Sequence, residues 1–138
     1  MEWRPEYSVG IKTIDRQHQE ILGYIRELAG ALESGDGWSV THGLLIQIKH
    51  FIKTHFAVEE ALLEICDYPD LPAHTVSHAA IETHLEKLER RSVKEDISQE
   101  LVQFLKDWFI SHVLKCDKEY GEHLAQTFPG VAFAPPAA

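Results

Sequence analysis

Four runs of the chain carry apolar side chains at intervals of three and four residues, and this spacing constrains the fold more than any other feature. Residues with this period share one face of an α-helix, and an apolar face is stable only when other elements cover it. Turn-forming stretches separate the runs: SGDG at 34–37, DYPDLP at 67–72 and PG at 129–130. The runs extend from Ile14 to Leu32, from Leu45 to Leu62, from Leu71 to Leu88 and from Ile97 to His112.

The connections between these runs are mostly short, and short connections favour antiparallel neighbours. We therefore predict an all-α fold, an up-down-up-down four-helix bundle that occupies residues 1–128. The segment 129–138 ends in FAPPAA and is predicted to be a disordered tail. Two local signals are typical of helix starts: Asp70 is expected to cap the third helix, and Ser92 with Glu95 fits a capping box for the fourth.

Charge and composition argue against several kinds of partner. The formal net charge is −9 and no Lys/Arg run is present, which disfavours nucleic acid and anionic membranes. No N-terminal signal pattern is visible, and no apolar stretch approaches the roughly 18 residues of a membrane span. The two cysteines, Cys66 and Cys116, are too few for a disulfide framework. We expect free thiols in a reducing cytoplasm, with no role assigned to either cysteine.

Polar side chains interrupt the apolar runs at positions where Leu or Ile would be expected. In HFAVEE, His55 and Glu59 are four residues apart and therefore lie on the same helical face. In an antiparallel bundle, the early parts of helices one and three meet the late parts of helices two and four. A buried imidazole or carboxylate costs free energy unless a partner satisfies it, so we predict a shared metal site. The interrupting residues are His18, His55, Glu59, His74, His78 and His112.

Asp117 is a further candidate ligand, although its spacing from His112 is awkward. Five residues of regular α-helix overshoot a full turn by about 140°, so a local adjustment would be required. The chain has nine histidines, and four of them, His42, His50, His84 and His123, fall off the apolar runs and are expected at the surface or its boundary. We expect Trp108 to form a wall of the core, whereas Glu60 could be solvated or could contact a ligand. Asp15, Glu119 and Tyr120 could cap helices or contact ligands.

The ligand types narrow the chemistry. Imidazole suits iron, zinc and copper, and one or two carboxylates can bridge two ions, so ligand type alone leaves zinc open. Ferritin-like di-iron bundles use more carboxylates, in pairs of Glu-x-x-His motifs that this chain lacks. Imidazole-rich sites stabilise highly oxidised iron less well. We therefore expect reversible dioxygen binding, at a position that seven ligand residues leave open on one of two ions.

Four segments together resemble the hemerythrin family in its single-domain bacterial form. They are W…YSVGIKTIDRQH, HFAVEE, YPDLPAHTVSH and WFISHVLKCD, and the resemblance runs from about Trp3 to about Leu124. It implies a bundle preceded by an N-terminal arm. It also implies a non-heme di-iron centre, with Glu59 and Asp117 bridging two irons together with an oxo or hydroxo group.

The resemblance further assigns a place to each ligand. It implies that His74, His78 and His112 bind one iron, and that His18 and His55 bind the other. Dioxygen would bind reversibly at the five-coordinate iron on the His18/His55 side, where a small anion such as azide could also bind. We expect the dioxygen pocket to be lined by Phe56, Trp108, Phe109 and Val113.

These features lead to one principal hypothesis and two alternatives. The principal hypothesis is an oxygen-binding protein rather than an enzyme, acting as a carrier, store or delivery protein. The first alternative is an oxygen- or redox-sensing module that acts through a protein partner. The second is a di-iron peroxidase or an iron-handling protein. A separate protein acceptor or reductant would be needed in some of these roles, and the sequence does not identify one.

Overall fold

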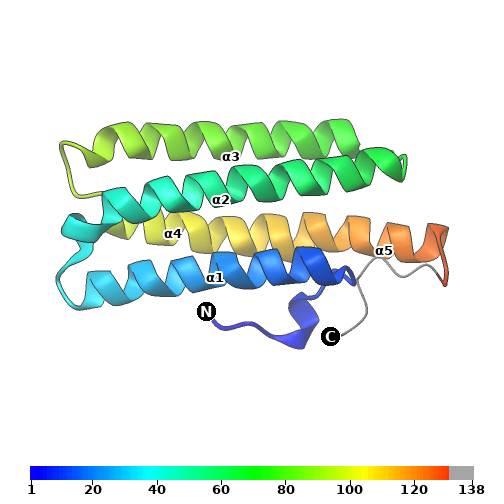
Figure 1. Cartoon of the computed structure of the whole chain (residues 1–138), viewed down its shortest axis with the longest axis horizontal. Coiled ribbons are helices and arrows are strands. Elements are labelled where there is room, and N and C mark those ends of the chain that lie inside the picture. Colours follow the sequence, from blue (N-terminus) through cyan, green and yellow to red (C-terminus); the bar gives the residue numbers. More distant parts are fainter. Residues whose placement is uncertain (131–138) are drawn as a thin grey trace.

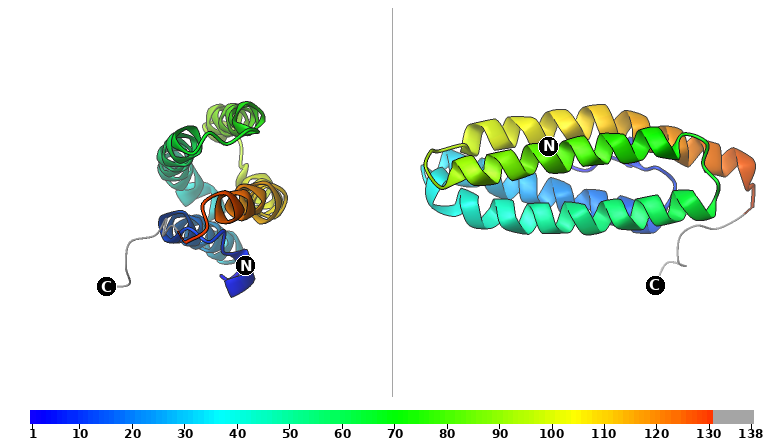
Figure 2. Two further views of the ribbon diagram at one scale, coloured as in Figure 1. Left: turned by 90° about the vertical axis from the view of Figure 1, so that its right-hand side faces the viewer. Right: turned by 90° about the horizontal axis from the view of Figure 1, so that it is seen from above.

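The computed structural model describes residues 1–130, and they form an antiparallel four-helix bundle, which confirms the predicted fold (Figure 1). Three helices are each one rod of the bundle. The fourth rod is a continuous run of three elements, and seen end-on the four rods surround a common axis (Figure 2). Of the predicted tail, 129–138, only Pro129 and Gly130 fall within the described residues. The elements are η1 (Pro5–Tyr7), α1 (Lys12–Glu33), α2 (Gly37–Ile65), α3 (Leu71–Ser92), α4 (Ser98–Trp108), the π-helical segment η2 (Phe109–Asp117) and α5 (Lys118–Thr127).

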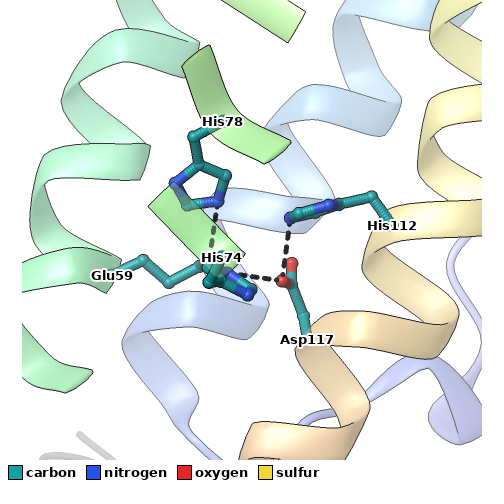
Figure 3. A group of neighbouring side chains, drawn as sticks. All are labelled: Glu59, His74, His78, His112 and Asp117. Atoms are coloured by element: carbon teal, nitrogen blue, oxygen red, sulfur yellow. Dashed lines mark hydrogen bonds and ion pairs between the residues drawn. The ribbon is translucent and has the colours of Figure 1, made fainter. Parts of the chain in front are cut away.

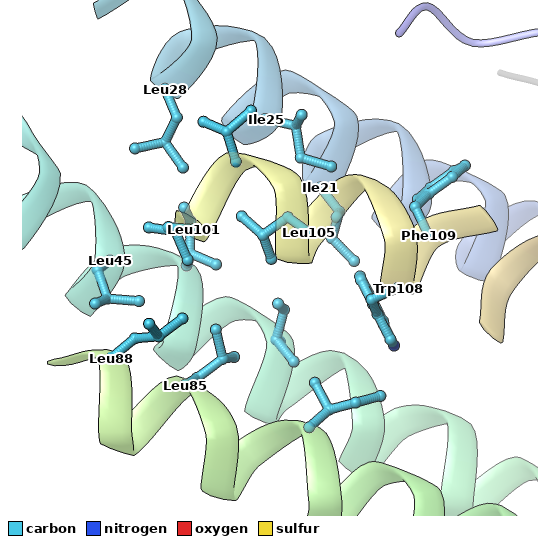
Figure 4. Packing of buried hydrophobic residues seen from close by; sticks show 14 of the residues in the cluster. Ile21, Ile25, Leu28, Leu45, Leu85, Leu88, Leu101, Leu105, Trp108 and Phe109 are labelled. Carbon is cyan, nitrogen blue, oxygen red and sulfur yellow. The ribbon is translucent and has the colours of Figure 1, made fainter. Parts of the chain in front are cut away.

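Apolar side chains form two separate buried clusters along the bundle. The main core packs residues of all four rods, among them Ile25, Leu45, Leu85 and Leu105, which are fully buried (Figure 4). A smaller cluster lies at the other end and includes Val9, Ile11, Ile14, Leu63, Tyr68, Tyr120 and Leu124. Along α1 and α2, the polar positions His18 and Glu59 fall between residues of the two clusters. A polar layer therefore separates the two cores.

The helix starts differ from the local signals in the sequence. Asp70 occupies the N-cap position of α3, but its side chain makes no capping hydrogen bond. The predicted capping box of Ser92 and Glu95 is wrong, because Ser92 is the last residue of α3 and its hydroxyl donates to the Glu89 carbonyl at 2.6 Å. The fourth rod begins later, at Ser98, whose backbone N–H donates to Asp96 Oδ1 at 3.0 Å.

The first eleven residues form an arm that packs along the bundle, as the family resemblance implied. Asp15 anchors it by accepting hydrogen bonds from the Ser8 hydroxyl at 2.5 Å and from the Val9 N–H at 2.9 Å. The arm also passes so close to α5 that a Cβ at Gly121 would lie 2.2 Å from the Val9 carbonyl oxygen. Tyr7 of the arm contacts Phe109 edge-on, with ring centroids 5.8 Å apart.

None of the helices within residues 1–130 combines the length and apolar character that a membrane crossing requires. Large apolar side chains nevertheless remain exposed at several helical positions, such as Ile65 at 80% and Val76 at 70%. Cys66 and Cys116 are free thiols and both are partly buried. Burial is the main reason that the pKa of each thiol is raised.

Candidate metal centre

The structure brings all seven predicted ligand residues into one buried cluster, of which Figure 3 draws the five around Asp117 and Glu59 on the α3 side. None of them is more than 6% exposed. They form two groups in which one donor atom from each residue lies within 4.8 Å of the others, and both groups contain Glu59 and Asp117. The first group is Glu59, His74, His78, His112 and Asp117, and the second is His18, His55, Glu59 and Asp117.

The two oxygen atoms of Glu59 face different groups of histidines. Oε1 lies 2.6 Å from His74 Nε2 and 3.2 Å from His78 Nε2, both on α3. Oε2 lies 3.0 Å from His55 Nε2 and 3.8 Å from His18 Nε2. The helical spacing of four residues places His55 and Glu59 together on α2. A carboxylate with one oxygen on each side is oriented to bridge two ions.

The two carboxylate oxygens of Asp117 also face different groups of histidines. Its Oδ1 lies 3.2 Å from both His74 Nε2 and His112 Nε2, and its Oδ2 lies 3.2 Å from His18 Nε2. The segment η2 supplies the local adjustment that the five-residue spacing required, because π-helical bonding from residue i to i+5 aligns His112 with Asp117. Such turns are frequent at functional sites.

The buried charges of the cluster stabilise one another. Burial disfavours a charged imidazole, but the close contacts and negative charges of Asp117 and Glu59 outweigh it and raise the pKa of His18 and of His74 to about 9. Burial also disfavours the carboxylates, yet close polar contacts with the histidine nitrogens hold the pKa of Asp117 at about 2 and that of Glu59 well below its usual range. The two carboxylates are therefore anionic, which favours cations between the histidines.

The hydrogen-bonding needs of the cluster fit metal ions as the missing partners. Several donor atoms are buried without a hydrogen-bond partner, which is costly in a protein interior. Seven of these atoms are imidazole nitrogens or carboxylate oxygens that face into the cluster; both types coordinate transition metals, and metal bonds would satisfy the seven together. The atoms are Nε2 of His18, His55, His78 and His112, Oε2 of Glu59, and both carboxylate oxygens of Asp117.

Three histidines also contact acceptors through the ring nitrogen that faces away from the cluster. His55 Nδ1 lies 2.5 Å from Gln17 Oε1, and His112 Nδ1 lies 3.0 Å from Ser77 Oγ. His78 Nδ1 lies 3.0 Å from Glu60 Oε2, so the structure decides that Glu60 contacts a candidate ligand. Sequence reasoning missed Gln17 and Ser77. Gln17 precedes His18 in the sequence but contacts His55 on α2. Ser77 precedes His78 but contacts His112 on the fourth rod. No local sequence pattern reveals such contacts between helices.

Aromatic side chains pack against the histidines. Phe56 stacks on His78 with ring centroids 3.6 Å apart and planes within 2° of parallel. Trp108 stacks near His112 at 6.0 Å, and Phe109 meets His18 edge-on at 6.2 Å. Val113 is fully buried and belongs to the same apolar core as these three residues. That these four side chains line a dioxygen pocket stays a prediction.

Tyr120 also lies beside the cluster, with its ring 5.5 Å from that of His74. Its hydroxyl is buried, and burial, together with the charges of Glu59 and Asp117, raises its pKa well above 10. Asp15 anchors the arm instead, and Glu119 is exposed in the first turn of α5. The histidines expected at the surface or its boundary are partly or fully exposed: His42, His50, His84 and His123.

Two openings between α3 and the fourth rod reach the cluster. A cavity of about 170 Å³ is bordered by His74, His112 and Cys116, and another of about 430 Å³ is bordered by Trp108, His112 and Cys116. Small molecules can therefore approach the His112 side from solvent. A wider groove of about 950 Å³ lies over α1 and includes Gln17 in its lining.

A four-helix bundle with a buried, histidine-rich cluster around two shared carboxylates defines a metal-binding bundle protein. Residues 9–124 match the family model described as the Hemerythrin HHE cation binding domain. The chain therefore belongs to the hemerythrin family, and this segment is a hemerythrin domain of the bacteriohemerythrin type.

Relatives and solved structures agree with this assignment. A bacteriohemerythrin of Stenotrophomonas maltophilia is 31% identical over 123 residues, which cover 88% of this chain and 80% of that protein. A myohemerythrin of Theromyzon tessulatum is 23% identical over 119 residues, which cover 86% of this chain and 89% of that protein. A crystal structure of wild-type hemerythrin superposes with a TM-score of 0.82 at 25% identity, covering 91% of this chain and 98% of that one.

Proposed function

We propose that the cluster binds two iron ions and that the chain binds dioxygen reversibly there, as an oxygen carrier, store or delivery protein rather than an enzyme. The main support for this proposal is the orientation of the two carboxylates: Glu59 and Asp117 each direct one oxygen to each group of histidines. The family resemblance adds an oxo or hydroxo group as a third bridge. Two irons held in this way would supply the electrons and the open coordination position that reversible dioxygen binding requires.

The two ion positions differ in the donors that the chain offers. One position has three histidines, His74, His78 and His112, whereas the other has His18 and His55 only. Because both positions share the carboxylates, the His18/His55 position has one protein donor fewer and has room for a small ligand. We place the dioxygen site there.

The residues beside this position exclude water. Phe109 packs edge-on against His18, and Phe56 and Val113 are almost completely buried nearby in the same core. A dry apolar wall slows the arrival of water and protons at a bound ligand, which favours release of dioxygen unchanged. The names of the bacteriohemerythrin and myohemerythrin relatives agree with a function of this kind.

The test is an optical titration of the purified, iron-loaded protein. We expect two irons per chain, near-ultraviolet absorption of the oxidised form that changes on adding azide, and loss of this absorption with dithionite. Exposure to air after removal of dithionite should give an oxygenated band that deoxygenation reverses. One zinc ion or a single iron per chain would contradict the assignment. Sustained turnover of peroxide with a reductant would favour the peroxidase alternative.

A cytoplasmic location is part of this proposal. It is supported by the two free thiols, since disulfides are rare and free cysteines common in reducing compartments. Fractionation of cells that express the protein would test it, and enrichment in an oxidising compartment would contradict it.

A further inference from the structure

The histidines of the two ion positions differ in the charge of the group behind them. His78 contacts a carboxylate, Glu60, through Nδ1, whereas His55 contacts the neutral amide of Gln17. The outward Nδ1 of each ring lies against an oxygen that can only accept, so Nδ1 carries a proton and donates it outward. A metal ion in the cluster would then be bound by Nε2, the inward nitrogen that faces Glu59. The third such contact, from His112 to Ser77, is also to a neutral group. Of these three contacts, only that of His78 is to a negatively charged acceptor.

The position of Glu60 places a solvated carboxylate beside a buried histidine. Its side chain is 34% exposed while His78 is 2% exposed, so water stabilises the carboxylate and the imidazole remains dry. Phe56 stacks on one face of the His78 ring and fixes its plane. The ring is therefore held in one orientation and one tautomer, with Nε2 facing the metal position.

A carboxylate that accepts the outward proton of a ligating histidine increases the basicity of the inward nitrogen. A neutral amide oxygen polarises the ring less, because it carries only a partial charge. His78 is therefore the stronger donor of the two, and stronger donation stabilises a more highly charged metal ion.

We propose that Glu60 is a positioning residue that makes the two ion positions unequal. It strengthens His78 as a donor and stabilises ferric over ferrous iron at the His74/His78/His112 position. Gln17 leaves the His18/His55 position without a comparable negative charge. This inference rests on the proposed iron centre, and it assigns control of the redox balance of that centre to one partly exposed carboxylate on α2.

Three single substitutions separate charge from hydrogen bonding. Glu60→Gln keeps an acceptor for His78 but removes the charge, and Gln17→Glu introduces a charge behind His55. Glu64→Gln is the matched control, because Glu64 is an exposed residue one turn further along α2 and the change in net charge is the same. Circular dichroism of each variant verifies that the bundle is folded.

Two measurements are made on each variant: Co²⁺ affinity of the metal-free protein and the midpoint reduction potential of the iron-loaded protein. Glu60→Gln should weaken Co²⁺ binding by about 10-fold, within the roughly 10- to 100-fold range for groups that orient ligands. It should also raise the midpoint potential, because ferric iron loses stabilisation. Gln17→Glu should lower the potential, and Glu64→Gln should leave both quantities at the parent values.

The outcomes distinguish the inference from the proposed function. If the parent protein binds neither Co²⁺ nor iron at this cluster, the proposed function itself fails. If the parent binds both metals but Glu60→Gln and Glu64→Gln shift the potential equally, the effect is one of overall charge and the role of Glu60 is overturned. A Glu60→Gln variant with the parent potential and affinity overturns it as well.

Discussion

Single side chains at the centre differ in whether they offer a donor atom or only fill space beside one. His78 directs Nε2 to within 3.2 Å of Glu59 Oε1, and this nitrogen has no hydrogen-bond partner. Val113 lies one residue after His112 and is also fully buried, but it offers only methyl groups to the core. Substituting each by Ala separates metal binding from the properties of the pocket.

His78→Ala should prevent assembly of a normal two-iron centre, because it removes one of three histidines at its position. The four histidines outside the cluster belong to neither donor group, so no spare imidazole is in place to replace it. Metal analysis after reconstitution measures this directly. Two irons per chain with reversible dioxygen binding in this variant would show that the proposed ligand set is wrong.

Val113→Ala should keep two irons but shorten the life of the oxygenated form. Loss of buried methyl groups should cost about 1–3 kcal/mol of stability and leave a cavity through which water and protons arrive more easily. The decay rate of the oxygenated band measures the effect. If the variant autoxidises at the parent rate, or if it loses its iron, Val113 does not line the pocket.

At the scale of secondary-structure elements, two departures from regular packing position the centre. The first is η2, which aligns His112 and Asp117 although five residues separate them. The second is the close approach of the arm to α5 at Gly121. A change in the number of residues within η2 tests the first departure, and a substitution at Gly121 tests the second.

Deletion of Lys115, which is exposed within η2, should preserve the centre. The deletion reduces the spacing from His112 to Asp117 to four residues, and four residues of regular α-helix also return to the same face. Insertion of one Ala after Lys115 should instead move Asp117 off that face and abolish two-iron binding. Iron content of the two variants decides the matter, and equal loss in both would mean that the π-helical geometry itself is required.

Gly121→Ala should destabilise the protein and weaken attachment of the arm. The added Cβ would approach the Val9 carbonyl oxygen to 2.2 Å, so the backbone of the arm must shift. Gly43→Ala is the matched control, because Gly43 lies within α2 and a Cβ there meets nothing within 4 Å. Urea unfolding should show a loss of stability for the first and a gain of roughly 0.5–1 kcal/mol for the second. Similar gains for both would show that the arm does not pack as described.

At the scale of the whole molecule, the centre joins all four rods at a layer where apolar packing is interrupted. The main core and the smaller cluster lie on either side of it, and each rod contributes at least one residue of the seven. Bonds to shared ions would connect helices whose buried polar atoms otherwise lack partners. Metal binding and folding should therefore be coupled.

Removal of iron should lower the melting temperature of the protein substantially. A ligand that binds only the folded state at 100 times its dissociation constant adds about 2.7 kcal/mol of stability. For a domain of this size that corresponds to a shift of the order of 10 °C. Thermal unfolding of metal-free and reconstituted protein measures the shift. Equal melting temperatures would indicate that the ions do not stabilise the contacts between rods.

Much of the fold and of the cluster could be predicted because both depend on local periodicity. The spacing of apolar residues reports the geometry of a single helix, and antiparallel topology then places the early part of one helix beside the late part of the next. Periodicity and topology together predict His18, His55, Glu59 and His112 at one height of the bundle. It also indicated that Asp117 needed an irregular helix, although not how long the irregular segment would be.

Only the tertiary structure decided which side chains contact the histidines from outside. The contacts of Glu60 with His78 and of Gln17 with His55 depend on the rotation and axial offset of whole helices, which packing of both cores determines together. The fourth rod begins at Ser98 rather than after Ser92 for a similar reason, because local capping signals compete and tertiary contacts select among them. The sequence by itself determined four helical faces and the polar positions on them, since these follow from covalent geometry. The unequal surroundings of the two ion positions arise only when those faces are packed against one another.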